Sequence, residues 1–445
     1  MSAASPMDHV AQLRAALGAL QKQSARIAEL EAASAVAHEP IAIVGLGCRF
    51  PGGAHGPEAF WEKLRAGFDA IREVPPERWP VDAHYDADPE AAGKIYTRHG
   101  AFLDDVDKFD ARFFNISPRE AATMDPQQRL LLETSWEAFE HAGLPPEKIA
   151  GSATGVFVGL TCIDYLKLIY RDDLRRLDTY CATGNIANIA AGRLSYFFGL
   201  RGPSLTLDTA CSSSLVAIHL ACQSLRTGES TLALAAGVNL ILAPDNSVAV
   251  ARARMLAPDG RCKTFDATAD GYARSEGCGV LLLKRLSLAR ADGNRILGVI
   301  RGTAVAQDGA RAGLTVPHGP SQTALLRAAL ASAGVAPAEV GYIEAHGTGT
   351  SLGDPIETEA LADVFARDPA RRAPLVLGSL KTNVGHMESA AGVGGVIKTV
   401  LALQHGEIPP HLHFTREHPE LHLADIPATV PTRLQPWPAM HARRI

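Results

Sequence analysis

The sequence has no uninterrupted apolar run of about 18 residues, the length that a membrane-spanning helix needs, so it predicts no membrane partner. Its first residues, Met1-Ser-Ala-Ala-Ser-Pro6, lack the basic and then apolar pattern of a secretory signal peptide. The seven cysteines show no paired spacing, and neither C-x-x-C nor H-E-x-x-H occurs. This cysteine usage predicts a reducing, cytoplasmic location without a disulfide framework, and it predicts no zinc site.

The sequence also lacks an excess of positive charge. Its 43 Lys and Arg residues are outnumbered by 48 Asp and Glu residues, which gives a formal net charge of -5. This balance argues against nucleic acid as the main partner. With 445 residues, of which 47% are hydrophobic and 20% charged, the composition predicts a soluble globular protein of two to three structural units with a large core.

Residues 8–33 have a pattern of their own. The apolar positions are spaced alternately by three and four residues, as in the a/d seam of a coiled coil. They are Val10, Leu13, Leu17, Leu20 and Ile27, with the polar Ser24 in the same series. The pattern predicts a short coiled coil of about three heptads. A solitary surface helix is the alternative, because Ser24 and the glycine at position 18 weaken the seam.

From residue 40 onward, apolar strands alternate with amphipathic helices. The alternation predicts a buried, mostly parallel sheet covered by helices on both faces, and two such rounds suggest two similar halves. Asp125 followed by Pro126 predicts the start of a helix that ends near Gly143. Gly279–Lys284 and Ile296–Ile300 are predicted to be paired strands.

Gly45-Leu-Gly47 follows the first predicted strand and suggests a dinucleotide-binding turn. However, Phe50 stands where that motif has its third glycine, and Pro51-Gly-Gly53 would break the helix that the motif requires. We therefore reject a dinucleotide site.

Cys211 lies between a predicted short strand, Ser204–Leu207, and a predicted helix, Ser213–Leu225. A cysteine on such a turn faces the unpaired N–H groups of the first helical turn, which favour the thiolate. Its own N–H can point at an oxygen on the carbon that the sulfur attacks. The stretch therefore predicts a nucleophile elbow for acyl transfer. The alternative is an inert, buried thiol, since free cysteine is often buried.

Two histidines occupy comparable positions at strand ends. His346 lies in Glu344-Ala-His-Gly-Thr-Gly-Thr350, a loop so rich in glycine that stability cannot explain it. A phosphate cradle is the alternative there, but the Lys-Ser/Thr ending of a P-loop is missing. Lys381 and His386 lie in a second such loop, where α/β proteins usually place their sites. Each histidine alone could be structural, but together with one cysteine they predict a catalytic set. The histidines at 405, 411, 413, 418 and 422 are predicted to be surface or packing residues.

The motifs Asp208-Thr-Ala-Cys-Ser-Ser-Ser214, Glu344–Thr350 and Lys381-Thr-Asn-Val-Gly-His386 together resemble the Cys-His-His signature of β-ketoacyl synthases. Further segments narrow the resemblance to the ketosynthase domain of bacterial modular type I polyketide synthases. These segments are Glu39–Gly45, Met124–Leu132, Leu256–Asp266 and Gly271–Gly277. The resemblance covers about residues 39–441.

The resemblance implies a thiolase-type αβαβα five-layered fold of two related halves, and a homodimer. It divides the chain into an N-terminal docking coiled coil (1–33), a linker (34–39) and a β-ketoacyl synthase domain (40–445). The N-terminal half of the domain would span about 40–285 and the C-terminal half about 286–445. The docking helix would bind an upstream polyketide synthase subunit, and acyl carrier protein domains would deliver the substrates for polyketide or antibiotic biosynthesis.

The family's chemistry implies a role for each candidate residue. Cys211 would accept an acyl chain as a thioester, and a malonyl-type extender on an acyl carrier protein would lose CO₂ and attack it. Neutral His346 and His386 would donate N–H groups to the developing oxyanion. Lys381 would orient and polarise the histidine region, unless it is merely structural. No cofactor would be bound directly, because the substrates are carried on the phosphopantetheine of the carrier protein.

One departure from the family bears on activity. Family members continue past the equivalent of Ile445 into a strand region with a Gly-Phe-Gly-Gly-Thr-Asn-like loop, whose N–H completes the oxyanion hole. We expect that this C-terminal strand region is missing because the chain is a fragment of a longer subunit. The alternatives are a piece supplied in trans, a transacylating ketosynthase that does not elongate, and a non-catalytic dimerisation or docking scaffold. Cys211 argues against decarboxylase-only variants, which carry Gln at that position.

Overall fold

A computed structural model describes residues 39–170, 177–310, 315–365, 373–421 and 427–437. It also describes isolated positions: 17, 19, 22, 23, 26, 175, 313, 371, 423, 444 and 445. The five isolated positions between 17 and 26 are helical. The rest of the predicted coiled coil at 1–33 lies outside the described residues, so that prediction stays untested.

The larger of the two main sheets has seven strands in the order β2-β1-β8-β7-β5-β6, with β9 also paired to β1. Its strands are β1 (Ile41–Phe50), β2 (Ala54–His55), β5 (Thr154–Gly159), β6 (Ser204–Leu207), β7 (Leu232–Asn239), β8 (Gly277–Arg285) and β9 (Gly298–Ile300). β5, β7 and most of β8 are buried throughout, as expected for strands covered on both faces.

The strand directions correct the sequence prediction of a mostly parallel sheet. Only β5 runs parallel to its neighbours β6 and β7, whereas β8 runs antiparallel to both β1 and β7. The predicted pairing of residues 279–284 with 296–300 is also wrong, because β9 pairs with Ile41–Ile43 of β1 instead. The residues of a strand that is apolar on both faces do not indicate which strand lies beside it or in which direction that strand runs. The sequence therefore could not predict the strand pairing or the strand directions.

Helices α5 (Pro126–His141) and α9 (Ala187–Phe198) cover the outer face of this sheet. The Asp125 side chain caps α5 by accepting from the Gln127 N–H at 2.8 Å, and so confirms the predicted helix start. Gly45 and Gly47 lie in β1 against α5, where an added Cβ would come within 2.6 Å and 2.5 Å of carbonyl oxygens of that helix. The Gly-x-Gly sequence therefore serves close packing between strand and helix.

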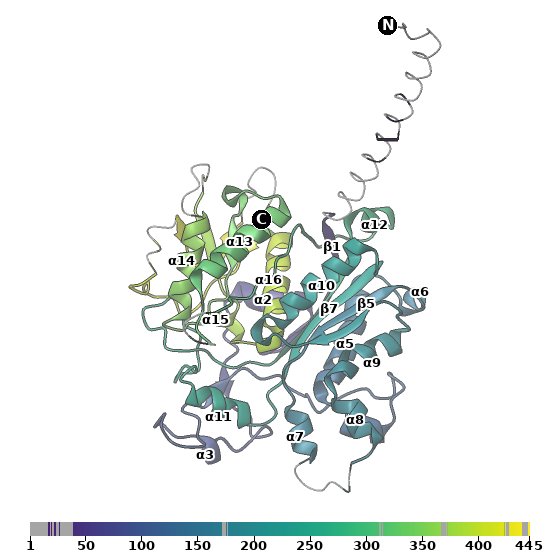
Figure 1. Ribbon diagram of the computed structural model, residues 1–445. Helices are drawn as coiled ribbons and strands as arrows, with labels where there is room; N and C mark the ends of the chain where they lie inside the picture. Colours follow the sequence, from purple (N-terminus) through teal and green to yellow (C-terminus); the bar gives the residue numbers. More distant parts are fainter. Residues whose placement is uncertain are drawn as a thin grey trace, which may run out of the picture.

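A central layer of two helices separates the two main sheets. It consists of α10 (Ser213–Thr227) and α16 (Ala391–His405), which pack against each other and against the large sheet. Gly392 permits this approach, because a Cβ there would lie 2.5 Å from the side chain of Leu215. In Figure 1, α16 lies between the teal sheet and the green helices.

The second main sheet has three parallel strands, β10 (Tyr342–Glu344), β11 (Leu375–Gly378) and β13 (Ala428–Thr429). Its outer face packs against α13 (Gly319–Ala333) and α14 (Gly353–Phe365) through a separate apolar core. The layers therefore alternate helix, sheet, helix, sheet, helix, as the predicted αβαβα architecture requires (Figure 1).

Short elements complete the described structure. The strands are β3 (Arg72–Glu73), β4 (His99–Gly100), β12 (Glu407–Ile408) and β14 (Gln435–Pro436). The α-helices are α2 (Pro57–Ala66), α3 (Val81–His84), α4 (Pro118–Thr123), α6 (Pro146–Ile149), α7 (Asp164–Tyr170), α8 (Thr179–Asn185), α11 (Asp245–Arg252), α12 (Leu286–Ala291) and α15 (Lys381–Val384). The 3₁₀ helices are η2 (Ala210–Ser212), η3 (Pro337–Glu339) and η4 (Glu388–Ala390). Within the described part of the chain, no helix combines the length and apolar composition that crossing a bilayer requires.

Candidate active site

Cys211 lies on the turn that connects β6 to α10, as the sequence predicts. The preceding residue, Ala210, has a φ of 54°, a left-handed conformation that is unfavourable for a residue with a Cβ. Hydrogen bonds hold this turn: Asp208 Oδ1 accepts from the Ala210 N–H at 2.9 Å, and the Ser213 hydroxyl donates to the Ala210 carbonyl at 2.7 Å. The strained turn presents the half-buried Cys211 thiol at the start of the central helix layer.

His386 approaches the sulfur from the second half of the chain. It follows α15 and lies 3.1 Å from Cys211, measured from Nε2 to Sγ. Its Nδ1 accepts a hydrogen bond from the Glu388 backbone N–H at 3.0 Å. A neutral imidazole whose Nδ1 accepts must carry its proton on Nε2. The ring of His386 therefore presents an N–H donor to the site.

His346 lies beside this pair, at the end of β10. Its ring centroid is 5.5 Å from that of His386, and the two planes are nearly perpendicular. The Glu357 carboxylate of α14 shapes the loop by accepting the backbone N–H groups of His346 and Gly347 at 2.7 Å and 2.8 Å. This contact argues against the phosphate-cradle alternative, because the Glu357 carboxylate already accepts two of the N–H groups that would bind a phosphate.

Lys381 is the first residue of α15 and not a loop residue as the sequence predicted, and it links the segments that carry the two histidines. Its Nζ donates to the His346 carbonyl oxygen at 2.6 Å, and the residue is only 8% exposed. The Lys381 ammonium is the main cause that lowers the pKa of His346 to about 3, and the packed surroundings of the ring are the second, although the residue itself is exposed. Burial, followed by the Lys381 charge, lowers the pKa of His386 well below its usual value. Both imidazoles are therefore neutral at neutral pH.

The state of the Cys211 thiol corrects one prediction. We expected the helix start to favour the thiolate, but burial and the nearby Glu388 carboxylate raise the pKa of Cys211, with Lys381 opposing them. The physical reason is that one α-helix terminus supplies only a partial charge, which does not offset the loss of water around the sulfur. Cys211 is thus a protonated thiol in the resting site.

Cys211, His346 and Lys381 open onto one cavity of about 330 Å³ between the two sheets. Most of the wall is apolar and comes from β9, α10 and α16. The apolar lining includes Leu215, Val299, Ile300, Val396, Val400 and Leu403. His386 does not line the cavity and is only 2% exposed, which places its ring behind the sulfur. The site can therefore hold an apolar acyl group next to a nucleophile and the imidazole of His346, with the His386 Nε2–H directed at the sulfur.

Sequence reasoning assigned no role to three residues that shape this site: Glu357, Glu388 and Arg274. Glu388 stands two positions after His386, and Arg274 lies in Gly271–Gly277, a segment used only to support the resemblance. Arg274 and Glu388 form an ion pair across 114 residues of sequence, a separation that no local pattern reveals. Among the described residues, no group of three or more His, Cys, Asp or Glu side chains could hold a metal ion.

Comparison with known proteins gives matches along almost the whole chain. The family model "Beta-ketoacyl synthase, N-terminal domain" matches residues 38–289, and "Beta-ketoacyl synthase, C-terminal domain" matches residues 297–415. One subunit of the phenolphthiocerol/phthiocerol polyketide synthase of Mycobacterium tuberculosis (strain ATCC 25618 / H37Rv) is 56% identical over 418 residues, which is 93% of this chain and 19% of the relative. Another subunit of the same synthase, from the same strain, is 51% identical over 406 residues, which is 91% of this chain and 26% of that relative.

Solved structures agree with these matches. The oxazolomycin ketosynthase domain OzmH KS7 of Streptomyces albus JA3453 superposes with a TM-score of 0.86 at 43% identity, covering 90% of this chain and 69% of that one. The ketosynthase from module 6 of the bacillaene synthase of Bacillus subtilis 168 gives a TM-score of 0.82 at 40% identity, covering 90% and 67%. This chain spans only about a fifth to a quarter of the length of the curated relatives just described. The chain thus belongs to the β-ketoacyl synthase family and has the thiolase-like fold of the ketosynthases from modular polyketide synthases.

Proposed function

We propose that this chain is a chain-elongating ketosynthase of a modular polyketide synthase, which extends a Cys211-bound acyl group by decarboxylative Claisen condensation. The observation that carries the proposal is the placement of two neutral imidazoles beside one cysteine: His386 Nε2–H lies 3.1 Å from the sulfur, and the His346 ring stands next to it. A neutral N–H donor suits a reaction in which negative charge develops on a thioester oxygen.

The first half-reaction loads Cys211. Its sulfur attacks the carbonyl carbon of an acyl thioester on the phosphopantetheine of a carrier protein. A new carbon–sulfur bond forms to Cys211, the bond to the pantetheine sulfur breaks, and the cysteine's proton ends on the departing thiol. The raised pKa of Cys211 fits this exchange, because a protonated resting thiol has a proton to deliver.

The second half-reaction forms the new carbon–carbon bond. A malonyl-type thioester loses CO₂, and the electrons of the broken bond form an enolate whose charge lies on the thioester oxygen. Removal of one preorganised donor from such an oxyanion typically costs about 3 to 4 kcal/mol of barrier. The enolate carbon then attacks the carbonyl carbon of the Cys211 thioester, the bond from that carbon to the Cys211 sulfur breaks, and the released thiolate takes up one proton from solvent. A carboxylate in place of either imidazole would offer only acceptors where donors are needed.

Lys381 supports the histidines in this proposal through its hydrogen bond and through its charge. Its hydrogen bond to the His346 carbonyl fixes the loop, and its charge keeps the His346 ring neutral. Lys381 is therefore a positioning residue, which narrows the role that the resemblance implies for it.

The partners we propose follow from the same chemistry. Acyl carrier protein domains deliver both thioesters, and residues 1–33 dock onto an upstream polyketide synthase subunit.

We also propose a homodimer formed through β6. Among the described residues, β6 is the outermost strand on one side of the large sheet, so one of its edges has no strand partner. Apolar side chains on and near β6 are exposed: Leu205 (46%), Ile186 (52%) and Tyr196 (89%). A second copy of the chain would cover both the strand edge and these side chains.

The test of the proposed function separates loading from condensation. The wild-type chain is incubated with a carrier-bound acyl thioester, and its intact mass is measured before and after addition of a malonyl-loaded carrier protein. We expect an acyl adduct that Cys211→Ala abolishes, and a condensation product that His346→Ala abolishes while the adduct remains. No adduct on the wild type would favour a non-catalytic scaffold. An adduct without any product would favour a transacylating ketosynthase.

A further inference from the structure

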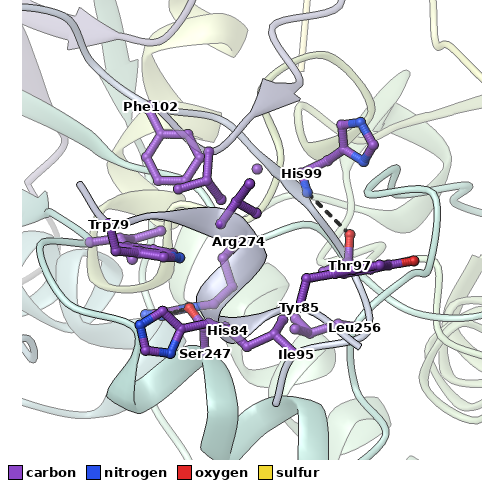
Figure 2. A pocket seen from close by; sticks show the side chains of 14 residues that line it. Trp79, His84, Tyr85, Ile95, Thr97, His99, Phe102, Ser247, Leu256 and Arg274 are labelled. Atoms are coloured by element: carbon purple, nitrogen blue, oxygen red, sulfur yellow. Dashed lines mark hydrogen bonds between the residues drawn. The ribbon is translucent and has the colours of Figure 1, made fainter. Parts of the chain in front are cut away.

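The side chain of Arg274 has every nitrogen engaged. Its Nε and Nη2 donate to the two carboxylate oxygens of Glu388 at 2.6 Å and 3.1 Å, and its Nη1 donates to the Ser247 hydroxyl at 2.7 Å. Figure 2 shows this side chain extending toward Ser247 in the pocket that Trp79 and Phe102 also line. A two-pronged Arg–carboxylate pair of this kind fixes direction as well as distance.

The surroundings of Arg274 offer its guanidinium few hydrogen-bond partners that could replace Glu388. Its side chain is 5% exposed, and a cavity of about 20 Å³ beside it is lined mostly by apolar and aromatic groups such as Val74, Trp79 and Phe102. A cavity of that size holds about one water molecule. Because a buried guanidinium without its carboxylate is strongly unfavourable, the pair with Glu388 persists in the folded state.

Glu388 has an unfavourable backbone conformation. Its φ is 46°, in the left-handed region that residues other than glycine, asparagine and aspartate rarely adopt. The N–H of this same residue donates to Nδ1 of His386, and so determines which nitrogen of that ring carries the proton. The tautomer of His386 therefore depends on a backbone conformation that needs support from elsewhere in the structure.

Arg274 is attached to His386 by the main chain as well. The backbone on either side of Arg274 forms a short parallel bridge to His386: the His386 N–H donates to the Ala273 carbonyl at 2.7 Å, and the Ser275 N–H donates to the His386 carbonyl at 2.9 Å. The bridge fixes the position of Arg274 relative to His386. Its side chain then reaches Glu388, which returns a hydrogen bond to the His386 ring.

From these connected contacts we infer that Arg274 and Glu388 are positioning residues. Their ion pair holds His386 in the tautomer that donates its Nε2–H toward Cys211. The functional consequence rests on the proposed role of His386 as an N–H donor. The structural part does not, since a tautomer can be observed without turnover. The pair lies behind the histidine and touches neither the sulfur nor the cavity of the acyl group in the described contacts.

The direct test is ¹⁵N nuclear magnetic resonance of the full chain labelled at histidine, with the His386 signals identified by their loss in His386→Gln. We expect the wild type to show an unprotonated Nδ1 and a protonated Nε2. In Arg274→Gln the two nitrogen shifts should move toward each other as the other tautomer becomes populated, and Arg274→Lys should restore them in part. Unchanged His386 shifts in a folded Arg274→Gln variant would overturn the inference.

A matched control separates this effect from general loss of stability. Arg193 forms a comparable partly buried ion pair with Glu120, with side-chain exposures of 11% and 21% against 5% and 20% for Arg274 and Glu388. Arg193→Gln should leave the His386 shifts unchanged. If Arg274→Gln fails to fold, Glu388→Ala provides a second route, because it removes the carboxylate that pairs with Arg274 and keeps the backbone N–H. This variant should lose the wild-type tautomer. An unchanged tautomer in Glu388→Ala would also overturn the inference.

Kinetics then connect the tautomer to the reaction. In Arg274→Gln we expect a fall of about 10- to 100-fold in the condensation kcat with little change in KM for the malonyl carrier, as misplacement of a reacting group predicts. A shifted tautomer with unchanged condensation would support the positioning role and would contradict the proposed donor role of His386. The two proposals can therefore fail separately.

Discussion

His386 Nε2 lies 3.1 Å from Cys211 Sγ, although 175 residues separate them in the sequence. The contact joins the two halves of the fold, because Cys211 precedes α10 of the first half and His386 precedes α16 of the second. These two helices pack against each other in the central layer. The site is therefore built where the halves meet, at the starts of two adjacent helices.

The charge of Lys381 should control the pKa of His346. In Lys381→Met the ammonium that lowers this pKa is lost, so we expect the pKa of His346 to rise by about 1 to 3 pH units toward its usual value. Lys381→Arg keeps the positive charge and should keep the pKa low. A histidine titration followed by nuclear magnetic resonance measures both values. An unchanged pKa in the Met variant would show that burial alone lowers it.

His411 should make stability dependent on pH. It is 3% exposed and stacks on Phe265, and burial lowers its pKa to about 3. Between pH 6.5 and 3 the unfolded chain binds a proton at this residue that the folded chain does not, so stability falls as the pH falls. The loss from this group between pH 7 and pH 5 should be about 2 kcal/mol. Urea unfolding at the two pH values measures it, and His411→Gln should reduce the difference by that amount.

Gly45 should resist substitution because α5 lies against it. A Cβ at this position would be 2.6 Å from the Ala138 carbonyl oxygen, so Gly45→Ala should lower the free energy of unfolding by about 1 to 3 kcal/mol. Gly192 in α9 is the matched control, since no atom outside its own stretch of helix lies within 4 Å of the position that a Cβ would take there. Gly192→Ala should instead raise stability by up to about 1 kcal/mol. Denaturant midpoints of the two variants should shift in opposite directions.

The proposed homodimer should depend on the exposed edge of β6. Leu205→Lys places a charge on the strand edge where a second copy would pack, so we expect sedimentation velocity to show a shift from dimer to monomer. Leu352→Lys is the control, because Leu352 is exposed to a similar extent, 54% against 46%, on the loop before α14. A wild-type chain that sediments as a monomer at micromolar concentration would contradict the proposal.

Removal of residues 1–33 tests the docking proposal. We expect the truncated chain to keep its thermal stability and its rate of self-loading from a small acyl thioester, because the described core begins with β1 at Ile41. Acyl transfer from the carrier domain of an upstream subunit should become slower. Equal transfer rates with and without residues 1–33 would show that this segment does not dock.

Much of the fold and the site could be predicted from local patterns. The Asp-Pro start of α5, the buried apolar strands and the strand–turn–helix around Cys211 each depend on neighbours within a few residues, and the structure has all of them. The Gly-rich loop at His346 was likewise visible as a strand end with no stabilising reason for its glycines. Local chemistry was enough to name the four candidate residues of the site.

Other properties depended on which distant groups meet. The antiparallel course of β8 and the pairing of β9 with β1 could not be read from strands whose two faces are equally apolar. The protonated state of Cys211 followed from burial and from a carboxylate far along the chain, and the tautomer of His386 follows from a hydrogen bond at a strained residue. The sequence by itself determined which side chains are available for chemistry. Only the tertiary structure decided their charge states and proton positions, because these depend on solvent exclusion and on through-space fields between residues far apart in the chain.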